Sequence, residues 1–267
     1  MPIECDYHMH TPLCQHATGP MEAYVERGIE LGLRTIGFSD HNPLPDGRGA
    51  NVRMTEAELD YYVNRVVDLQ FQYRSQIDVR LGLELDYVPG LEDYLQRQIA
   101  AYPWDYIIGS AHYFDLDCRM GTWSRNYPGA VDEQYLRYFE RVAQLADAKL
   151  CDIIAHLDVV KRCARPPTPV SLAGMEAALM AIAAAGVCME INTSGYRHAE
   201  LPEPQPYPAL PFVERAIILG IPLTVNSDSH APEHVGYNFA VVESFLQKHE
   251  CRQLCRFEKR QRSFYGL

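Results

Sequence analysis

Short segments of apolar and β-branched residues alternate with longer segments of helical length along the whole chain. When turn residues bound them, such apolar segments predict buried β-strands. The predicted strands span residues 5–10, 34–38, 78–86, 106–112, 151–156, 187–192 and 222–226, and the predicted helices span 21–33, 131–148, 171–185, 208–219 and 239–249. Seven strand–helix units with right-handed crossovers predict an α/β fold with a barrel-like parallel sheet, one unit short of the usual eight.

Other local signals complete this pattern. Thr55 followed by Glu58 predicts a capping box that starts one more helix. Residues 253–260 alternate enough to predict a short final strand. The loops at 42–53 and 114–128 are long enough to fold over a site, and we expect them to supply the residues that recognise a substrate.

The third predicted strand shows which of its faces is polar. Because side chains alternate across a strand, its three leucines share one face, and the other face holds Gly82, Glu84 and Asp86. A carboxylate at the end of a strand is often solvated. The alternation instead predicts that Glu84 points inward.

Composition and charge narrow the class of protein. No linker, repeat or low-complexity tract divides the 267 residues, so we expect one domain over residues 1–267, and 47% hydrophobic residues can fill its core. The net charge of −11 argues against a nucleic-acid partner, although bound divalent cations would cancel part of it. No apolar run has the roughly 18 residues of a membrane span. The eight cysteines lack paired spacing, which favours a reducing, cytoplasmic location. Nothing in the sequence indicates an oligomeric state.

Metal-ligand residue types recur where the predicted strands end. In a closed parallel barrel, the carboxyl ends of the strands surround the site, because the βα loops open there. A lone His-x-His is more often a pair of ordinary core or surface histidines, and His8-Met9-His10 by itself would prove little. The whole set is much less expected by chance. It comprises His8, His10, His16, His41, Glu84, His112, His156, Asp228 and His230.

These residues also carry a family resemblance. The chain resembles the polymerase-and-histidinol-phosphatase (PHP) family in His8-Met9-His10, Ser39-Asp40-His41, Glu84, Gly109-Ser110-Ala111-His112, His156 and Asp228-Ser229-His230. The resemblance implies a distorted seven-stranded (β/α) TIM-like barrel with three divalent metals at the carboxyl ends of the strands. It implies one metal on His8, His10, Glu84 and Asp228, a second on Glu84, His112 and His156, and a third on His16, His41 and His230. Mixed imidazole and carboxylate ligands suit zinc, iron or manganese.

Within the family, the chain looks most like the stand-alone histidinol-phosphate phosphatases. The motifs that point this way are Cys14-Gln15-His16-Ala17, Gly82-Leu83-Glu84-Leu85-Asp86-Tyr87 and Asn192-Thr193-Ser194-Gly195-Tyr196-Arg197. The resemblance implies hydrolysis of L-histidinol phosphate to L-histidinol and phosphate, with a metal-bridging hydroxide as nucleophile. The alternatives are a PHP phosphoesterase acting on another small phosphate such as a nucleoside bisphosphate, an amide-cleaving or deaminating metal hydrolase, and a metal-binding module without turnover. Amide-cleaving and deaminating sites usually carry a bridging lysine at a strand end, and this sequence places none there.

Several further residues receive roles as hypotheses. Glu84, Arg197, Asp228 and His230 are the candidate catalytic residues. Arg197 is the candidate phosphate clamp, since a guanidinium matches phosphate oxygens, and Lys161 and Arg162 are weaker candidates for phosphate binding. We expect Asp40 to orient His41. Glu190 and Asn192 are either partners of ligands or satisfied interior groups, and Tyr113 and Phe114 either stack on a substrate ring or pack.

Overall fold

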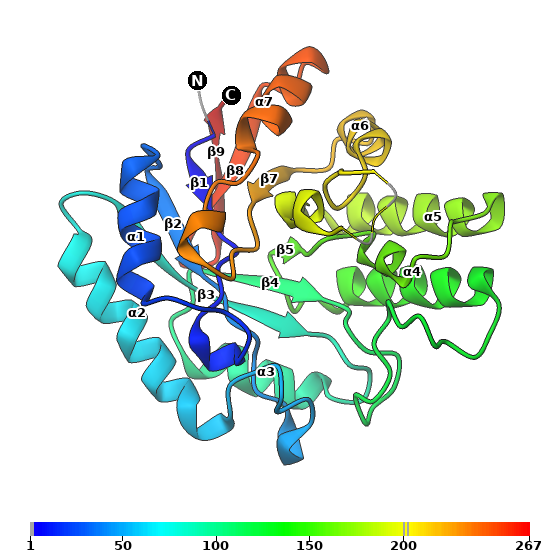
Figure 1. The fold of residues 1–267 in the computed structure, drawn as a ribbon, viewed down its shortest axis with the longest axis horizontal. Coiled ribbons are helices and arrows are strands. Elements are labelled where there is room, and N and C mark those ends of the chain that lie inside the picture. The colour runs from blue at the N-terminus through cyan, green and yellow to red at the C-terminus, as the bar shows by residue number, and fades with distance from the viewer. Residues whose placement is uncertain (1–2, 200, 202) are drawn as a thin grey trace.

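The computed structural model describes residues 3–199, 201 and 203–267, and its centre is a sheet of seven parallel strands (Figure 1). Each strand pairs with the next one along the chain, in the order β1 to β7. The strands are β1 (Cys5–Asp6), β2 (Thr35–Phe38), β3 (Asp78–Asp86), β4 (Tyr106–Ser110), β5 (Ile153–Ile154), β6 (Cys188–Asn192) and β7 (Leu223–Asn226). The predicted seven-stranded parallel barrel is confirmed, with β1 and β5 shorter than predicted.

The barrel closes between its first and last strands just beyond their carboxyl ends. The backbone N–H of Ser229 donates to the carbonyl of His8 at 2.9 Å, and that of His10 donates to the carbonyl of Ser229 at 2.8 Å. The backbone N–H of Tyr7 also donates to the side-chain oxygen of Asn226 at 2.9 Å. Closure therefore holds the backbone of the His-x-His motif against the segment that carries Asp228 and His230.

Helices surround this barrel (Figure 1). They are α1 (Met21–Glu30), α2 (Leu59–Tyr73), α3 (Glu92–Ala101), α4 (Val131–Ala148), α5 (Pro169–Ala185), α6 (Leu210–Ile218) and α7 (Phe239–Lys248). The capping box before α2 is confirmed, with Glu58 accepting from the backbone N–H of Thr55 at 2.8 Å. Helix α3 is missing from the predicted set, because its mostly polar sequence presents only a narrow apolar stripe at Leu95. Within the described residues, no helix combines the length and hydropathy needed to cross a membrane.

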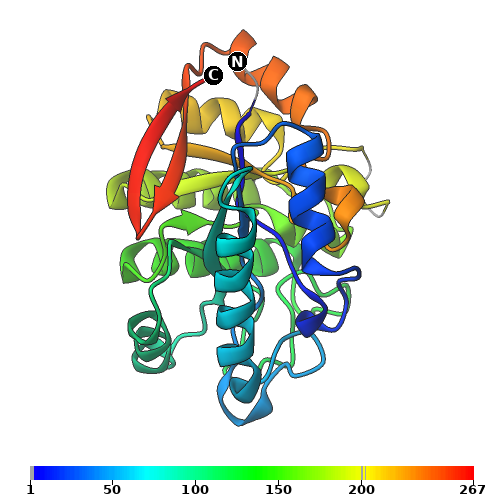
Figure 2. The ribbon, with the colours of Figure 1, turned by 90° about the vertical axis from the view of Figure 1, so that its left-hand side faces the viewer.

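The tail of the chain differs from the prediction. Instead of one strand over 253–260, it forms an antiparallel hairpin of β8 (Gln253–Glu258) and β9 (Gln261–Gly266), which is a separate sheet. The hairpin covers the amino ends of the strands, since Arg260 binds Asp152, which immediately precedes β5, at 2.6 Å. In Figure 2 it lies in red at the left-hand edge, away from the dark-blue loop around residue 14. A turn at 259–260 with two left-handed residues reverses the chain, and no Gly or Pro announces it in the sequence.

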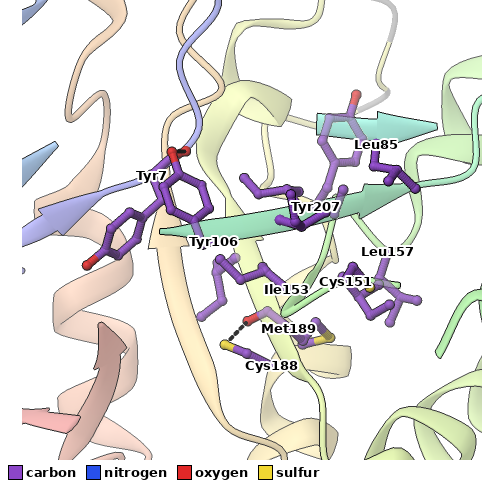
Figure 3. Packing of buried hydrophobic residues seen from close by; sticks show 14 of the residues in the cluster. Tyr7, Leu85, Tyr106, Cys151, Ile153, Leu157, Cys188, Met189 and Tyr207 are labelled. Atoms are coloured by element: carbon purple, nitrogen blue, oxygen red, sulfur yellow. Dashed lines mark hydrogen bonds between the residues drawn. The ribbon is translucent and has the colours of Figure 1, made fainter. Parts of the chain in front are cut away.

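The interior between the two ends is filled by large side chains. Tyr106 is fully buried, packs its ring 4.9 Å from that of Tyr7, and places its hydroxyl 2.6 Å from the Tyr7 carbonyl (Figure 3). Gly37 and Gly82 leave room for this ring, because a Cβ at either position would lie 2.2 Å from a Tyr106 atom. Because side chains fill the interior, a site at the carboxyl end of the barrel is closed on the side that faces the core.

Candidate metal centre

The nine residues predicted as metal ligands meet at the carboxyl end of the barrel. Six of the seven strands contribute at or near their carboxyl ends. His8 and His10 follow β1, His41 follows β2, and Glu84 lies within β3. His112, His156 and the pair Asp228 and His230 follow β4, β5 and β7, and His16 follows the short helix η1 (Pro12–Cys14). All except His8 line one cavity of about 390 Å³, and His8 is fully buried beside it.

The side chains form three groups whose possible ligand atoms lie within 4.8 Å of one another. These groups are His8, His10 and Glu84; Glu84, His112 and His156; and His16, His41 and His230. Asp228 lies close to the first group, with Oδ1 3.3 Å from Nε2 of His10. Glu84 belongs to two groups, so its two oxygens face different sets of imidazoles. Two further groups combine Cys14 with His10 and His230, and Asp86 with His41 and His112, so the division of the ligands among three cations stays a prediction.

Glu84 is the electrostatic centre of the site. Its Oε2 lies 2.9 Å from Nδ1 of His41, and its Oε1 lies 3.1 Å from Nε2 of His156. Burial raises the pKa of Glu84, but the neighbouring imidazoles, His41 first, outweigh burial and bring that pKa well below its usual range. In the described part of the chain, no lysine or arginine lies within ion-pair distance of this carboxylate. Within the described residues, its negative charge is therefore compensated by imidazoles, which are themselves metal ligands, and not by a lysine or an arginine.

Unsatisfied atoms identify what the site lacks. Among the described residues, Nε2 of His8, Nδ1 of His41 and Oε2 of Glu84 are buried and form no hydrogen bond, although the last two atoms lie 2.9 Å apart. Buried polar atoms are almost always paired, and imidazole nitrogens with carboxylate oxygens are ligands for divalent transition metals. The residues present therefore fit divalent cations placed between them.

Three buried carboxylates turn imidazoles toward this centre. Nδ1 of His8 lies 3.0 Å from Glu190, that of His10 lies 3.4 Å from Asp40, and that of His112 lies 2.7 Å from Asp86. Each contact leaves the Nε2 of that ring free to face Glu84. A carboxylate on one ring nitrogen fixes the tautomer and raises the basicity of the other nitrogen. These contacts orient the predicted ligands.

Glu190, Asn192 and Asp40 all contact predicted ligands. Glu190 contacts a predicted ligand, and the amide of Asn192 donates to Glu190 at 2.8 Å and to Asp228 at 3.2 Å, so both serve the site. The role expected of Asp40 is to orient or buttress His41. It accepts the backbone N–H of His41 at 2.8 Å, but the imidazole that its carboxylate contacts is that of His10, at 3.4 Å.

Cys14 is a functional candidate that the sequence analysis missed. It is fully buried, and its sulfur lies within the ligand distance that groups it with His10 and His230. Burial raises the pKa of the thiol, but hydrogen bonds from His10 and His16 outweigh burial and lower the pKa to about 7. The signal available in the sequence was its position two residues before His16.

The structure separates the three residues predicted to bind phosphate. Arg162 lines the cavity, with its guanidinium 5.5 Å from the centre of the Trp123 ring. Lys161 does not: its amine donates to Asp158 at 3.0 Å and to the Pro206 carbonyl at 2.7 Å, and it faces a separate cavity. Successive residues of the short helix η4 (Val159–Cys163) point to different sides, so the phosphate role proposed for Lys161 is corrected.

Arg197 lies behind the site. Its guanidinium donates to the carbonyl oxygens of Ser227 and Asp228, at 3.0 and 2.8 Å, and it is absent from the residues that line the cavity. These contacts hold the segment that carries Asp228 and His230. Arg197 is therefore placed to position two predicted ligands, and its phosphate contact stays a prediction.

The outer wall of the cavity comes from the two loops expected to recognise the substrate. The loop at 42–53 contributes Val52 and Arg53, and the segment at 114–128 contributes Gly121, Trp123 and Ser124. Tyr113 also lines the cavity. Phe114 instead packs 5.4 Å from the ring of Tyr127, which favours the packing role for it.

Comparisons with known proteins agree with this geometry. A model of the PHP domain family matches residues 6–194. The "Probable histidinol-phosphatase" of Deinococcus radiodurans is 36% identical over 245 residues, covering 88% of this chain and 90% of that protein. The histidinol-phosphatase of Bacillus subtilis is 27% identical over 274 residues, covering 91% of this chain and 98% of that protein.

A solved structure shows the same fold. Histidinol phosphate phosphatase (HISK) from Lactococcus lactis, complexed with zinc, L-histidinol and phosphate, matches with a TM-score of 0.79 at 20% identity. The match covers 97% of this chain and 98% of that one.

Proposed function

This chain belongs to the PHP family, and from that premise we propose that it hydrolyses L-histidinol phosphate to L-histidinol and phosphate. It is a metal-dependent phosphoric monoester hydrolase of histidine biosynthesis. The observation that carries the proposal is the cavity in which Glu84 joins two groups of imidazoles and, among the described residues, has no lysine or arginine within ion-pair distance. Relatives that span nearly the whole chain support the substrate.

We assign three divalent cations to this centre. The first would be held by His8, His10, Glu84 and Asp228, the second by Glu84, His112 and His156, and the third by His16, His41 and His230. Zinc, iron and manganese all suit these donors. When bound, such cations supply Lewis acidity and positive charge for hydrolysis of a phosphate monoester.

The residues of the chain divide the remaining work. Glu84, Asp228 and His230 would hold the cations, and the reacting phosphate would lie beside those cations in the cavity. Arg162, at the cavity wall, is the arginine best placed to contact a phosphate oxygen. Trp123 and Tyr113 also line the cavity, and their flat apolar surfaces suit an imidazole ring. A cavity of about 390 Å³ is of the size that encloses a small ligand.

A substrate panel tests the proposal. Metal-loaded protein is given L-histidinol phosphate, a nucleoside 3′,5′-bisphosphate and an aryl phosphate, and phosphate release is measured. We expect kcat/KM for L-histidinol phosphate to exceed the others by at least about 10³-fold, because selective sites lose several kcal/mol when polar contacts are missing. Faster turnover of the bisphosphate would be consistent with the proposed metal centre but would contradict L-histidinol phosphate as the substrate.

The cysteines support a location in a reducing compartment such as the cytoplasm. All eight are free thiols in the structure, and seven of them are buried. Disulfides form and persist in oxidising compartments, and no pair here forms one. We expect the enzyme to be equally active with and without a reducing agent in the buffer, because buried thiols are protected from oxidation.

A further inference from the structure

Arg53 is a buried arginine at the end of the loop at 42–53, for which the proposed mechanism has no use so far. Only 1% of its surface is exposed, although it lies in a loop. One of its terminal nitrogens, Nη2, donates to Oδ2 of Asp86 at 2.6 Å, and the other, Nη1, donates to the carbonyl of Asn42 at 2.8 Å. Removing a guanidinium from water is costly unless it is paired, so these contacts define where the loop rests.

The same carboxylate continues to the metal centre. Oδ1 of Asp86 lies 2.7 Å from Nδ1 of His112, and Asp86 is fully buried. Nε2 of His112 then lies 3.4 Å from Oε1 of Glu84 and 3.2 Å from Nε2 of His156. Arg53, Asp86 and His112 therefore form an unbroken chain of contacts from the loop to one group of predicted ligands.

The other two orienting carboxylates have no such link. Glu190 is held by the amides of Asn192 and Asn226, at 2.8 Å each, and Asp40 is held by the hydroxyl and backbone N–H of Thr11. Among the described residues, neither carboxylate forms an ion pair with an arginine or a lysine. Of the three ligand-orienting carboxylates, only Asp86, which contacts His112, forms an ion pair with an arginine among the described residues.

The loop is also a wall of the catalytic cavity. Val52 and Arg53 line the cavity, and the side chain of Gln15, next to His16, donates to the carbonyls of Ala50 and Arg53. The side-chain oxygen of Asn42 accepts from the backbone N–H of Asp86 at 2.9 Å. Both ends of the loop are therefore tied to Asp86, one through Asn42 and the other through Arg53.

We propose that Arg53 is a positioning residue that latches the loop at 42–53 over the cavity and, through Asp86, sets the ring of His112 for the cation it shares with Glu84 and His156. Its effect on turnover rests on the proposed function, but its effect on loop order and metal affinity does not. Loss of the latch should loosen the loop and weaken one class of metal site while leaving the others unchanged.

The test compares Arg53→Met, which keeps an apolar stem, with Arg53→Lys and with Arg48→Met. Arg48 is the matched control, since it is an arginine of the same loop that contacts the Leu116 carbonyl at 3.1 Å and does not reach Asp86. Zinc affinity is measured on the full chain by competition with a chelator. We expect one class of sites in Arg53→Met to weaken about 10- to 100-fold, as for other residues that orient a metal ligand. Arg53→Lys should recover part of this loss, and Arg48→Met should bind as the unaltered protein does.

Two further measurements distinguish a latch from a general loss of structure. Amide hydrogen exchange should accelerate in residues 42–53 of Arg53→Met and stay unchanged in β6 and β7. With L-histidinol phosphate, KM should rise more than kcat falls. Asp86→Asn, which removes the middle of the chain of contacts, should weaken the same class of zinc sites.

The outcomes that overturn the inference are separate from failure of the proposed function. Unchanged zinc affinity and exchange in Arg53→Met would refute the latch, as would equal weakening of every site or an equal effect in Arg48→Met. If Arg53→Met does not fold, Arg53→Lys with the zinc affinity of the unaltered protein would refute it. If the zinc and exchange effects are observed but the protein hydrolyses a different ester, the latch is supported and the proposed substrate is wrong.

Discussion

Carboxylates at the amino end of the barrel and Glu84 at its carboxyl end have different partners. At the amino end, Asp152 is held by Arg260 at 2.6 Å and by the backbone N–H of Ile107 at 2.8 Å. Asp105 accepts from the backbone N–H groups of Leu81 and Lys259, at 3.0 and 3.1 Å. At the carboxyl end, Glu84 is surrounded by five imidazoles and has an oxygen without any hydrogen-bond partner.

This difference indicates that one end of the barrel contributes to folding stability and the other end to metal binding and catalysis. A buried charge must be compensated, and at the amino end the β8–β9 hairpin brings the compensating cation within the chain. At the carboxyl end, Arg53 pairs with Asp86, but among the described residues Glu84 has only imidazoles around it, which are themselves ligands for cations from outside. The first end should therefore govern the free energy of unfolding, and the second should govern metal binding and turnover.

The largest effect is expected from Glu84→Gln. The substitution removes the shared carboxylate, so we expect metal content to fall and kcat to drop by at least about 10³-fold. The metal-free variant should unfold at a urea concentration only slightly lower than that of the metal-free parent, because the lost attraction between the carboxylate and its imidazoles is partly offset by the smaller desolvation cost of an amide. Metal analysis, kinetics and urea titration check these points. A strongly destabilised metal-free variant would break the comparison.

The next effect concerns the segment that carries Asp228 and His230. Arg197→Ala removes the two donors to the carbonyls of Ser227 and Asp228, so we expect kcat/KM to fall about 10- to 100-fold together with metal affinity. Chelator competition and phosphate release are measured on the same preparation. Loss of turnover with full metal content would instead favour the phosphate clamp predicted from the sequence.

The amino end is tested by Arg260→Met. Asp152 would lose its ion pair, and because this pair is partly exposed we expect the free energy of unfolding to fall by only about 1–2 kcal/mol. The kcat of the folded enzyme should not change. Arg256→Met is the control, since Arg256 is exposed on the same hairpin and donates to the hydroxyl of Ser263, with no ion pair to a carboxylate among the described residues. A change in kcat or metal content would show that the two ends are coupled.

The smallest effect is expected for Lys161→Met. Its amine is held by Asp158 and the Pro206 carbonyl outside the catalytic cavity, so KM for L-histidinol phosphate should change less than about twofold. The neighbouring Arg162→Met should raise KM about tenfold, since a charge-assisted hydrogen bond contributes roughly 1.5–3 kcal/mol. Equal effects of the two substitutions would restore Lys161 as a phosphate ligand.

The sequence alone determined the barrel, the family and the end of each strand at which ligand residues gather. These features are local: alternation of side chains along a strand placed Glu84 inward, and a histidine directly after an apolar run marks a strand end. Each can be read within about ten residues. The capping box at Thr55 and Glu58 was predictable for the same reason.

Only the tertiary structure decided which side chains meet. Asp40 orients His10 rather than His41, Lys161 faces away from the cavity, and Arg53 reaches Asp86 from a loop. The closing hairpin and its Arg260–Asp152 pair also join segments far apart in sequence. Such contacts depend on how the strands are arranged around the barrel and on side-chain direction at irregular positions, where neither the period of a helix nor that of a strand applies.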